Sequence, residues 1–141
     1  MHFISIAQEI HVQHYLGTDL YNKIAELIKT DAIATTVYET LLIDYVQPML
    51  IHYAMVDFLP FGAYQIKNGG IFKHVSENAE TVSKNEIDFL VEKERTMAEY
   101  YTRRFISYMD FNQTSYPEYT SNTNDDIYPD RDEPTFQGWV L

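Results

Sequence analysis

Residues 83–109 read SKNEIDFLVEKERTMAEYYTRRFISYM, and this stretch decides the fold class of the 141-residue chain. Ser83 and Glu86 have the spacing of a capping box, in which the two side chains satisfy free backbone amides at a helix start. Apolar side chains then recur at helical spacing: Ile87, Leu90, Val91, Met97, Ala98, Tyr101, Phe105, Tyr108 and Met109. The stretch therefore predicts one long amphipathic helix that packs against other helices.

Further helices are predicted between residues 3 and 56. Ser5 and Thr36 each open a capping box, the first before a short helix and the second before a long one. Gly17 predicts a stop after the first helix, because glycine accepts the left-handed conformation that ends helices. Pro48 removes one backbone hydrogen bond, so we expect a kink or a break there. The apolar face of the first helix is expected to hold Phe3, Ile6, Ala7, Ile10 and His14.

A β-hairpin is predicted after the long helix. Pro60-Phe61-Gly62 is expected to end the helical run, and residues 63–67 and 71–75 then flank Asn68-Gly69-Gly70. Asn-Gly suits the positive backbone angles of a tight hairpin turn. Such a hairpin must pack on helices or pair with another chain to be stable. The predicted fold class is mostly α: a small helical bundle with one short β-hairpin and an extended C-terminal arm.

Charge divides the chain near residue 110. Residues 110–141 carry 7 of the 21 acidic side chains and one of the 10 basic ones, so they supply more than half of the net charge of −11. The same residues hold three of the five prolines. We therefore expect a helical domain over residues 1–109 and an acidic arm rich in Pro and Tyr over residues 110–141.

Composition excludes several classes of protein. A net charge of −11 argues against sequence-specific binding of duplex DNA, which needs a basic surface. The chain has no cysteine, which excludes disulfides and thiolate zinc sites. No apolar run approaches the roughly 20 residues of a membrane span, and the first residues lack the pattern of a signal peptide. We therefore expect no membrane partner.

Little in the sequence points to catalysis. His11 and His14 are three residues apart, as metal ligands sometimes are, but no carboxylate follows at the spacing of a di-iron helix. His52 and Asp57 are five apart and fall on different helix faces. The chain has neither a nucleophile elbow nor a phosphate-binding loop. We expect no enzyme activity, no metal and no cofactor, and an enzyme that uses these histidines is the weakest hypothesis.

The arm is the main candidate binding segment. Isolated aromatic residues between prolines and charges are typical of segments that become ordered on a partner. The alternative is an arm that folds back over its own helices. The candidate partner-binding residues are Tyr116, Tyr119, Ile127, Tyr128, Phe136, Trp139 and Leu141 in the arm, and Asn68, Gly69, Gly70, Ile71 and Phe72 in the hairpin.

The order of motifs resembles a known family. The features are a helix around Ile6-Ala7, then Tyr15-Leu16-Gly17-Thr18-Asp19-Leu20-Tyr21, the Leu41–Pro48 helix, the Asn68-Gly69-Gly70-Ile71 hairpin and a final helix that ends in Ala98–Arg104. Over about residues 3–109 the chain resembles the head–tail connector (adaptor) proteins of tailed bacteriophages, in particular those of phages of Bacteroidetes, including the crAss-like group.

The resemblance implies a structural virion protein that is not an enzyme. Members of that family are small helical proteins that form rings, usually of twelve copies, between the portal and the tail around the DNA channel. The implied partners are copies of the chain itself, the portal protein and a tail or second adaptor ring protein. The implied location is the head–tail junction, after assembly in the cytoplasm of the host bacterium. Negative charge on the channel wall would keep DNA from sticking.

A second hypothesis fits the same residues. The chain can be a monomeric or dimeric helical protein-binding module, whose acidic arm mimics nucleic acid or covers a basic partner. A symmetric ring would exclude this module. Under the connector hypothesis, deleting residues 134–141 is expected to weaken assembly and to leave the helical circular dichroism nearly unchanged.

Overall fold

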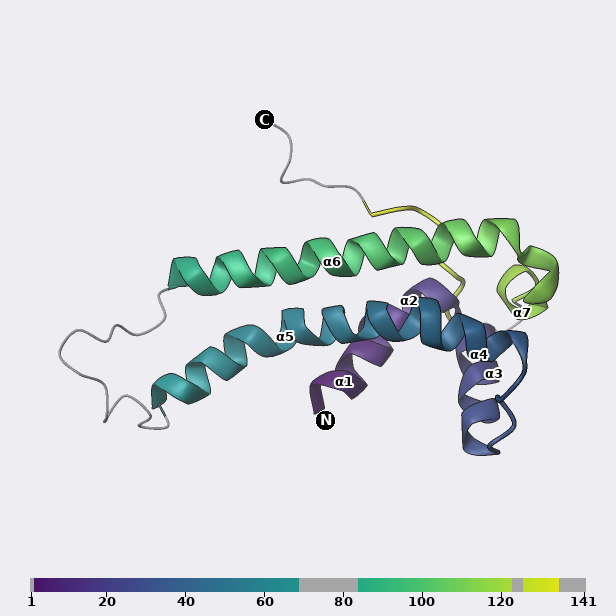
Figure 1. Cartoon of the computed structure of the whole chain (residues 1–141), viewed down its shortest axis with the longest axis horizontal. Coiled ribbons are helices and arrows are strands. Elements are labelled where there is room, and N and C mark those ends of the chain that lie inside the picture. Colours follow the sequence, from purple (N-terminus) through teal and green to yellow (C-terminus); the bar gives the residue numbers. More distant parts are fainter. Residues whose placement is uncertain (1, 69–83, 123–125, 135–141) are drawn as a thin grey trace.

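Two long antiparallel helices run side by side along most of the molecule (Figure 1). The computed structural model describes residues 2–68, 84–122 and 126–134. The elements in chain order are α1 (His2–Ala7), the π turn η1 (Gln8–Val12), α2 (Gln13–Leu16), α3 (Thr18–Lys29), α4 (Val37–Leu41), the π turn η2 (Leu42–Val46), α5 (Gln47–Asn68), α6 (Lys84–Phe111), the 3-10 turn η4 (Gln113–Ser115) and α7 (Pro117–Thr120).

The predicted long helix is confirmed as α6, which packs along α5. Its buried side chains lie on one face: Ala98, Thr102, Phe105, Ile106 and Met109. Because these residues recur every three or four positions, they form a continuous stripe toward the other helices. The helix thus supplies one wall of the core along its second half.

The N-terminal segment is helical from His2, so the expected start at the Ser5 capping box is wrong. The π turn η1 follows, and the buried residues Ala7 and Val12 are five positions apart across it. A π turn holds one more residue than an α turn and so rotates the rest of the helix. Ile10 consequently lies on the surface, 59% exposed, although it was expected on the apolar face.

The predicted break at Gly17 is confirmed. Gly17 has φ 79° and separates α2 from α3, and α3 turns away so that Leu20 and Ile24 enter the core. The hydroxyl of Thr18 does not cap α3. It accepts a hydrogen bond from the Ile127 backbone N–H at 3.0 Å, so this joint already carries part of the arm.

The break expected at Pro48 takes the form of the π turn η2, one turn upstream. Asp44, whose carbonyl Pro48 cannot serve, lies inside this turn. Leu41 and Val46 are both buried and again five positions apart. The chain therefore continues as helix on both sides of the proline.

The predicted β-hairpin is wrong in the part that the structure describes. Residues 63–67, its first strand, belong to α5, and the described residues contain no strand. The second strand, residues 71–75, lies outside the described residues. Ala63, Gln65 and Lys67 are good helix formers, so the helix extends through them instead of pairing as a strand.

Pro60 does not end α5 either, although it was expected to. The ring of Phe3 packs on Phe58 and Phe61, with ring centroids 5.6 and 5.1 Å apart, and so stabilises the turns on both sides of the proline. Gly62 leaves room for the Phe58 ring, since a β-carbon there would lie 2.7 Å from it. Tertiary contacts thus override the local signal.

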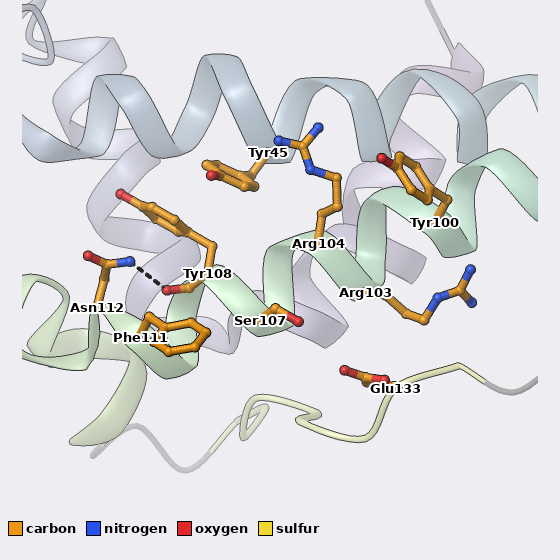
Figure 2. A pocket seen from close by; sticks show the side chains of 9 residues that line it. All are labelled: Tyr45, Tyr100, Arg103, Arg104, Ser107, Tyr108, Phe111, Asn112 and Glu133. Atoms are coloured by element: carbon orange, nitrogen blue, oxygen red, sulfur yellow. Dashed lines mark hydrogen bonds between the residues drawn. The ribbon is translucent and has the colours of Figure 1, made fainter.

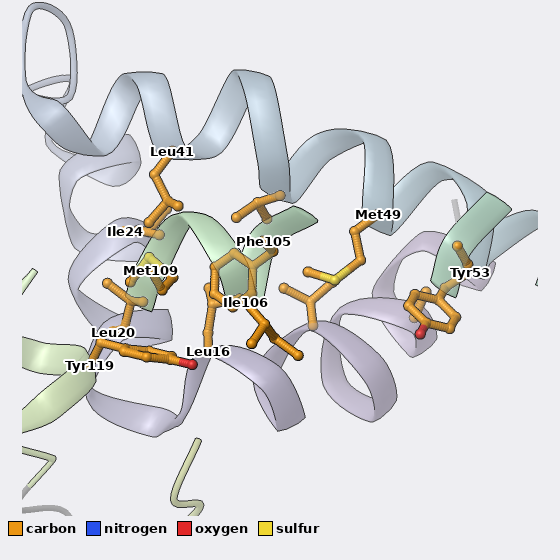
Figure 3. Close-up of a cluster of buried hydrophobic side chains, with 14 of the residues drawn as sticks. Leu16, Leu20, Ile24, Leu41, Met49, Tyr53, Phe105, Ile106, Met109 and Tyr119 are labelled. Carbon is orange, nitrogen blue, oxygen red and sulfur yellow. The ribbon is translucent and has the colours of Figure 1, made fainter. Parts of the chain in front are cut away.

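The core extends beyond residue 110. Tyr116 and Tyr119 are fully buried, and Tyr119 belongs to the same core cluster as Leu16, Leu20 and Met109 (Figure 3). Residues 112–122, with η4 and α7, turn back onto the end of the bundle (Figure 1). The first part of the arm is therefore packed on its own chain.

Candidate partner-binding site

Backbone hydrogen bonds hold residues 126–131 of the arm across the joint between α2 and α3. Besides the bond to its hydroxyl, Thr18 donates its backbone N–H to the carbonyl of Ile127 at 2.9 Å. The N–H of Asp130 donates to the carbonyl of His14 at 3.0 Å, and the His14 ring contacts the Asp130 carboxylate at 2.8 Å. The described part of the arm therefore follows the alternative in which it folds over its own helices.

The candidate residues from the sequence fall into three groups. Tyr116 and Tyr119 are core residues, Ile127 is half-buried and Tyr128 is 60% exposed. Asn68 is the last residue of α5. The remaining candidates lie outside the described residues: Gly69, Gly70, Ile71, Phe72, Phe136, Trp139 and Leu141. Among the described candidates of the arm, Tyr128 is thus the one with most of its side chain exposed.

A cluster of tyrosines joins the arm to the helices. The Tyr116 hydroxyl donates to the Val37 carbonyl at 2.8 Å and contacts the Tyr108 hydroxyl at 2.8 Å. The Tyr38 hydroxyl donates to Glu118 at 2.6 Å. Burial and these neighbours raise the pKa values of Tyr38 and Tyr116 well above the usual 10, so both phenols stay neutral. The cluster fixes the end of the bundle without presenting a reactive group.

Beside this cluster lies an open groove of about 520 Å³ over the outer side of α6 (Figure 2). We call it the Arg104 groove. Its lining residues come from η2, α6 and the arm: Tyr45, Tyr100, Arg103, Arg104, Ser107, Tyr108, Phe111, Asn112 and Glu133. Aromatic rings and two guanidinium groups therefore share one surface in a strongly acidic chain.

The two arginines of the groove are held differently. The Arg104 guanidinium lies over the rings of Tyr45 and Tyr101, 5.3 and 6.0 Å from their centroids, a cation–π arrangement. Arg103 reaches the carbonyl of Pro134 at 3.5 Å. No ion pair between described residues includes Arg104. Its charge is positioned by aromatic rings and is still available to a carboxylate.

An exposed apolar stripe continues the groove along α6. Leu90, Met97, Arg104 and Phe111 are spaced by seven residues, which places them on one side of the helix. Phe111 is 89% exposed, and Leu90 and Met97 are also exposed. We call these four residues the outer stripe. Leu90 and Met97 were expected on the core face, and Phe111 was expected to be an anchor of the arm, whereas it is the last residue of α6. The seven-residue repeat is the sequence signal that could have identified them.

Each of three histidines pairs with a different carboxylate. His11 lies 3.8 Å from Asp57 and stacks on Tyr53, and His52 contacts Glu94 at 2.6 Å and stacks on Tyr101. The third pair joins His14 to the arm. Burial lowers the pKa of His11 from 6.5, an effect partly opposed by Asp57. These pairs cross-link separate elements and do not converge on one catalytic centre.

Neither a metal-binding cluster nor a membrane-spanning helix occurs among the described residues. They contain no group of three or more His, Asp or Glu side chains that could hold a metal ion. None of the helices there is long and apolar enough to cross a membrane. The Arg104 groove and the outer stripe therefore carry the functional argument.

One family model matches residues 12–128, and it describes a family of unknown function (DUF6712). The matched region includes the joint at Gly17, the long helices and the buried part of the arm. No curated protein and no solved structure matches the chain.

Proposed function

The chain belongs to the family of unknown function DUF6712, and for this member we propose the role of a structural head–tail connector subunit in a tailed phage. In this role, copies of the chain form a ring between portal and tail around the DNA channel. The chain performs no chemistry there.

The outer stripe of α6 carries this proposal. Phe111, Met97 and Leu90 are large apolar side chains exposed at a seven-residue repeat, and Tyr100 lies exposed beside them. A repeat of this kind is typical of a helix face that packs against another chain, and contiguous apolar surface marks interaction sites. The resemblance to phage connectors supplies the kind of assembly.

Net charge supports the same role. A chain with a charge of −11 does not bind passing duplex DNA, because like charges repel. In the proposed ring, the wall of the channel carries carboxylates, and the apolar outer stripe is turned toward other protein chains. A lumen lined by Lys and Arg would contradict this part of the proposal.

The proposal is tested by the assembly state of the full chain. The chain is expressed alone and together with the portal protein encoded in the same genome, and particles are examined by multi-angle light scattering and electron microscopy. We expect rings with rotational symmetry, free or attached to the portal. A chain that remains monomeric in both preparations would contradict the proposal.

A matched pair of variants ties the assembly to the outer stripe. Leu90→Glu with Met97→Glu places carboxylates in the stripe, and we expect it to abolish ring formation while helical circular dichroism is retained. Ile28→Glu is the control, because Ile28 is also an exposed apolar side chain but lies on α3. If the control variant disrupts assembly as much as the stripe variant, the stripe is not the contact surface.

The second candidate is a monomeric or dimeric protein-binding module with an acidic arm. The arm residues that the structure describes pack on their own helices, through Tyr116, Tyr119 and Ile127, and this observation favours a self-contained unit. The same experiment separates the two candidates, because a stable monomer that ignores the portal supports the module.

A further inference from the structure

The Arg104 groove has the chemistry to bind an acidic segment that carries an aromatic residue. We propose that the groove of one copy receives the acidic arm of a second copy, in the region of Asp126, Tyr128 and Asp132. The inference rests on the proposed function and names the contact that joins neighbouring subunits.

The groove presents a fixed positive charge on an aromatic surface. Arg104 is positioned over Tyr45 and Tyr101 and makes no ion pair with any residue that the structure describes. A guanidinium binds a carboxylate through two parallel hydrogen bonds, which gives geometric specificity as well as energy. Phe111 and Tyr100 add exposed apolar surface on either side (Figure 2).

The arm offers the complementary chemistry. Tyr128 is 60% exposed, and Asp126 and Asp132 on either side of it are also exposed. Backbone bonds from Ile127 and Asp130 hold this part of the arm on its own chain. The arm can therefore dock as a preformed surface, which lowers the entropic cost of binding.

Charge selects a second copy as the occupant. Two chains with a charge of −11 repel each other unless a basic surface of one meets an acidic surface of the other. The lining of the Arg104 groove supplies such a basic surface, because it holds two guanidinium groups, Arg103 and Arg104, and one carboxylate, Glu133. The arm carries most of the excess acid. A contact between these two surfaces brings opposite charges together and offsets the repulsion between the two chains.

The contact also has the geometry that a ring requires. The lining of the groove and the Asp126–Asp132 surface consist of different residues, so the contact is heterologous. Contacts of this type place each copy head to tail with the next, and they close into rings when the rotation permits.

Charge reversal at Arg104 tests the inference in the full chain. Arg104→Glu is expected to weaken self-association by at least about tenfold, measured by sedimentation velocity, and Arg104→Lys to weaken it less. Lys23→Glu is the matched control. Lys23 lies 5.9 Å over the Tyr38 ring, so this variant makes the same charge change and removes the same kind of contact on another element.

A charge swap identifies the occupant. Asp132→Arg places a positive charge on the arm, and its cis contact is retained because Asp132 bonds Asp130 through its backbone N–H. Combined with Arg104→Glu in one chain, it restores an attractive pair between neighbouring copies, so we expect association to recover. Circular dichroism of all variants checks that they are folded.

The outcomes separate the inference from the proposed function. If Arg104→Glu forms rings as readily as the wild type does, the inference is overturned and the proposed function is left intact. Weakened association that Asp132→Arg does not restore overturns the arm as the occupant. A wild-type chain that never associates, alone or with the portal, contradicts the proposed function itself. The inference is supported if self-association is weakened by Arg104→Glu, recovers in the double variant and is unchanged by Lys23→Glu.

Discussion

The ring of Pro129 occupies the space beside Gly17 that any other residue would need for its β-carbon. A β-carbon on Gly17 would lie 2.5 Å from Cγ of Pro129. Gly17 also has a φ of 79°, which disfavours side chains. One glycine therefore serves two purposes: it turns the chain from α2 into α3 and it admits the arm.

Gly17→Ala is expected to destabilise the protein by about 2 to 4 kcal/mol, from backbone strain together with the clash against the arm. Urea unfolding measures the change. Pro129→Ala in the same background removes the clash but not the strain, so the double variant should recover part of the loss. Equal stability of the single and double variants would show that Pro129 does not press on this position.

Tyr116 and Tyr119 are equally buried but differ in their hydroxyl groups. The Tyr116 hydroxyl bonds to Val37 and Tyr108, whereas that of Tyr119 has no hydrogen-bond partner among the described residues. Burial, partly opposed by Arg131, raises the pKa of Tyr119 to about 12. The hydroxyl is thus buried, neutral and unsatisfied.

Tyr119→Phe is therefore expected to leave stability unchanged or to raise it by up to about 1 kcal/mol, because an unsatisfied polar group is removed. Tyr116→Phe is expected to lower stability by about 1 to 3 kcal/mol, because the Val37 carbonyl loses its donor. Both values come from chemical denaturation. The reverse order of the two variants would disprove the assignment of these hydroxyls.

His11 makes stability depend on pH. Burial lowers its pKa in the folded state below 6.5, so the unfolded chain binds the proton more readily. Stability is then highest above pH 6.5 and falls as pH decreases through 6.5 toward the folded pKa. We expect the stability advantage of the wild type over His11→Gln to shrink between pH 7.5 and pH 5.5. Denaturation curves at both pH values measure it, and an advantage that grows on acidification would refute the sign.

The regular part of the fold was predictable because its signals are local. The apolar period of residues 83–109 continues from Ile87 to Met109, and α6 spans all of these positions. Gly17 alone predicts the end of α2, because the conformational freedom of its backbone does not depend on distant residues. Where one short pattern competed with its surroundings, as in residues 63–67, the neighbouring helix and the contacts of Phe3 decided the outcome.

Both π turns interrupt the spacing of three and four residues by which the sequence predicts the buried face of a helix. Ala7 and Val12, and likewise Leu41 and Val46, are buried pairs five residues apart. Spacings of three and four residues do not include such pairs, and they place Ile10 on the apolar face instead. The extra residue in each turn is tolerated because packing against α5 and α6 offsets the cost of the less favourable helix geometry.

The Arg104 groove was not predictable, since its parts come from η2, α6 and the arm. The sequence indicated that the arm matters, but composition alone favoured a free, extended segment. The deciding residues are Tyr116 and Tyr119, whose rings fit a gap that only the assembled helices create.

That gap has a consequence for the order of events during translation. Tyr116 and Tyr119 complete a core whose other walls are made of much earlier residues, such as Leu16 and Leu20. A nascent chain whose residues through Tyr119 have not all left the ribosome cannot close this core, whatever helices it has formed. The protein therefore reaches its native state only after most of it has been synthesised.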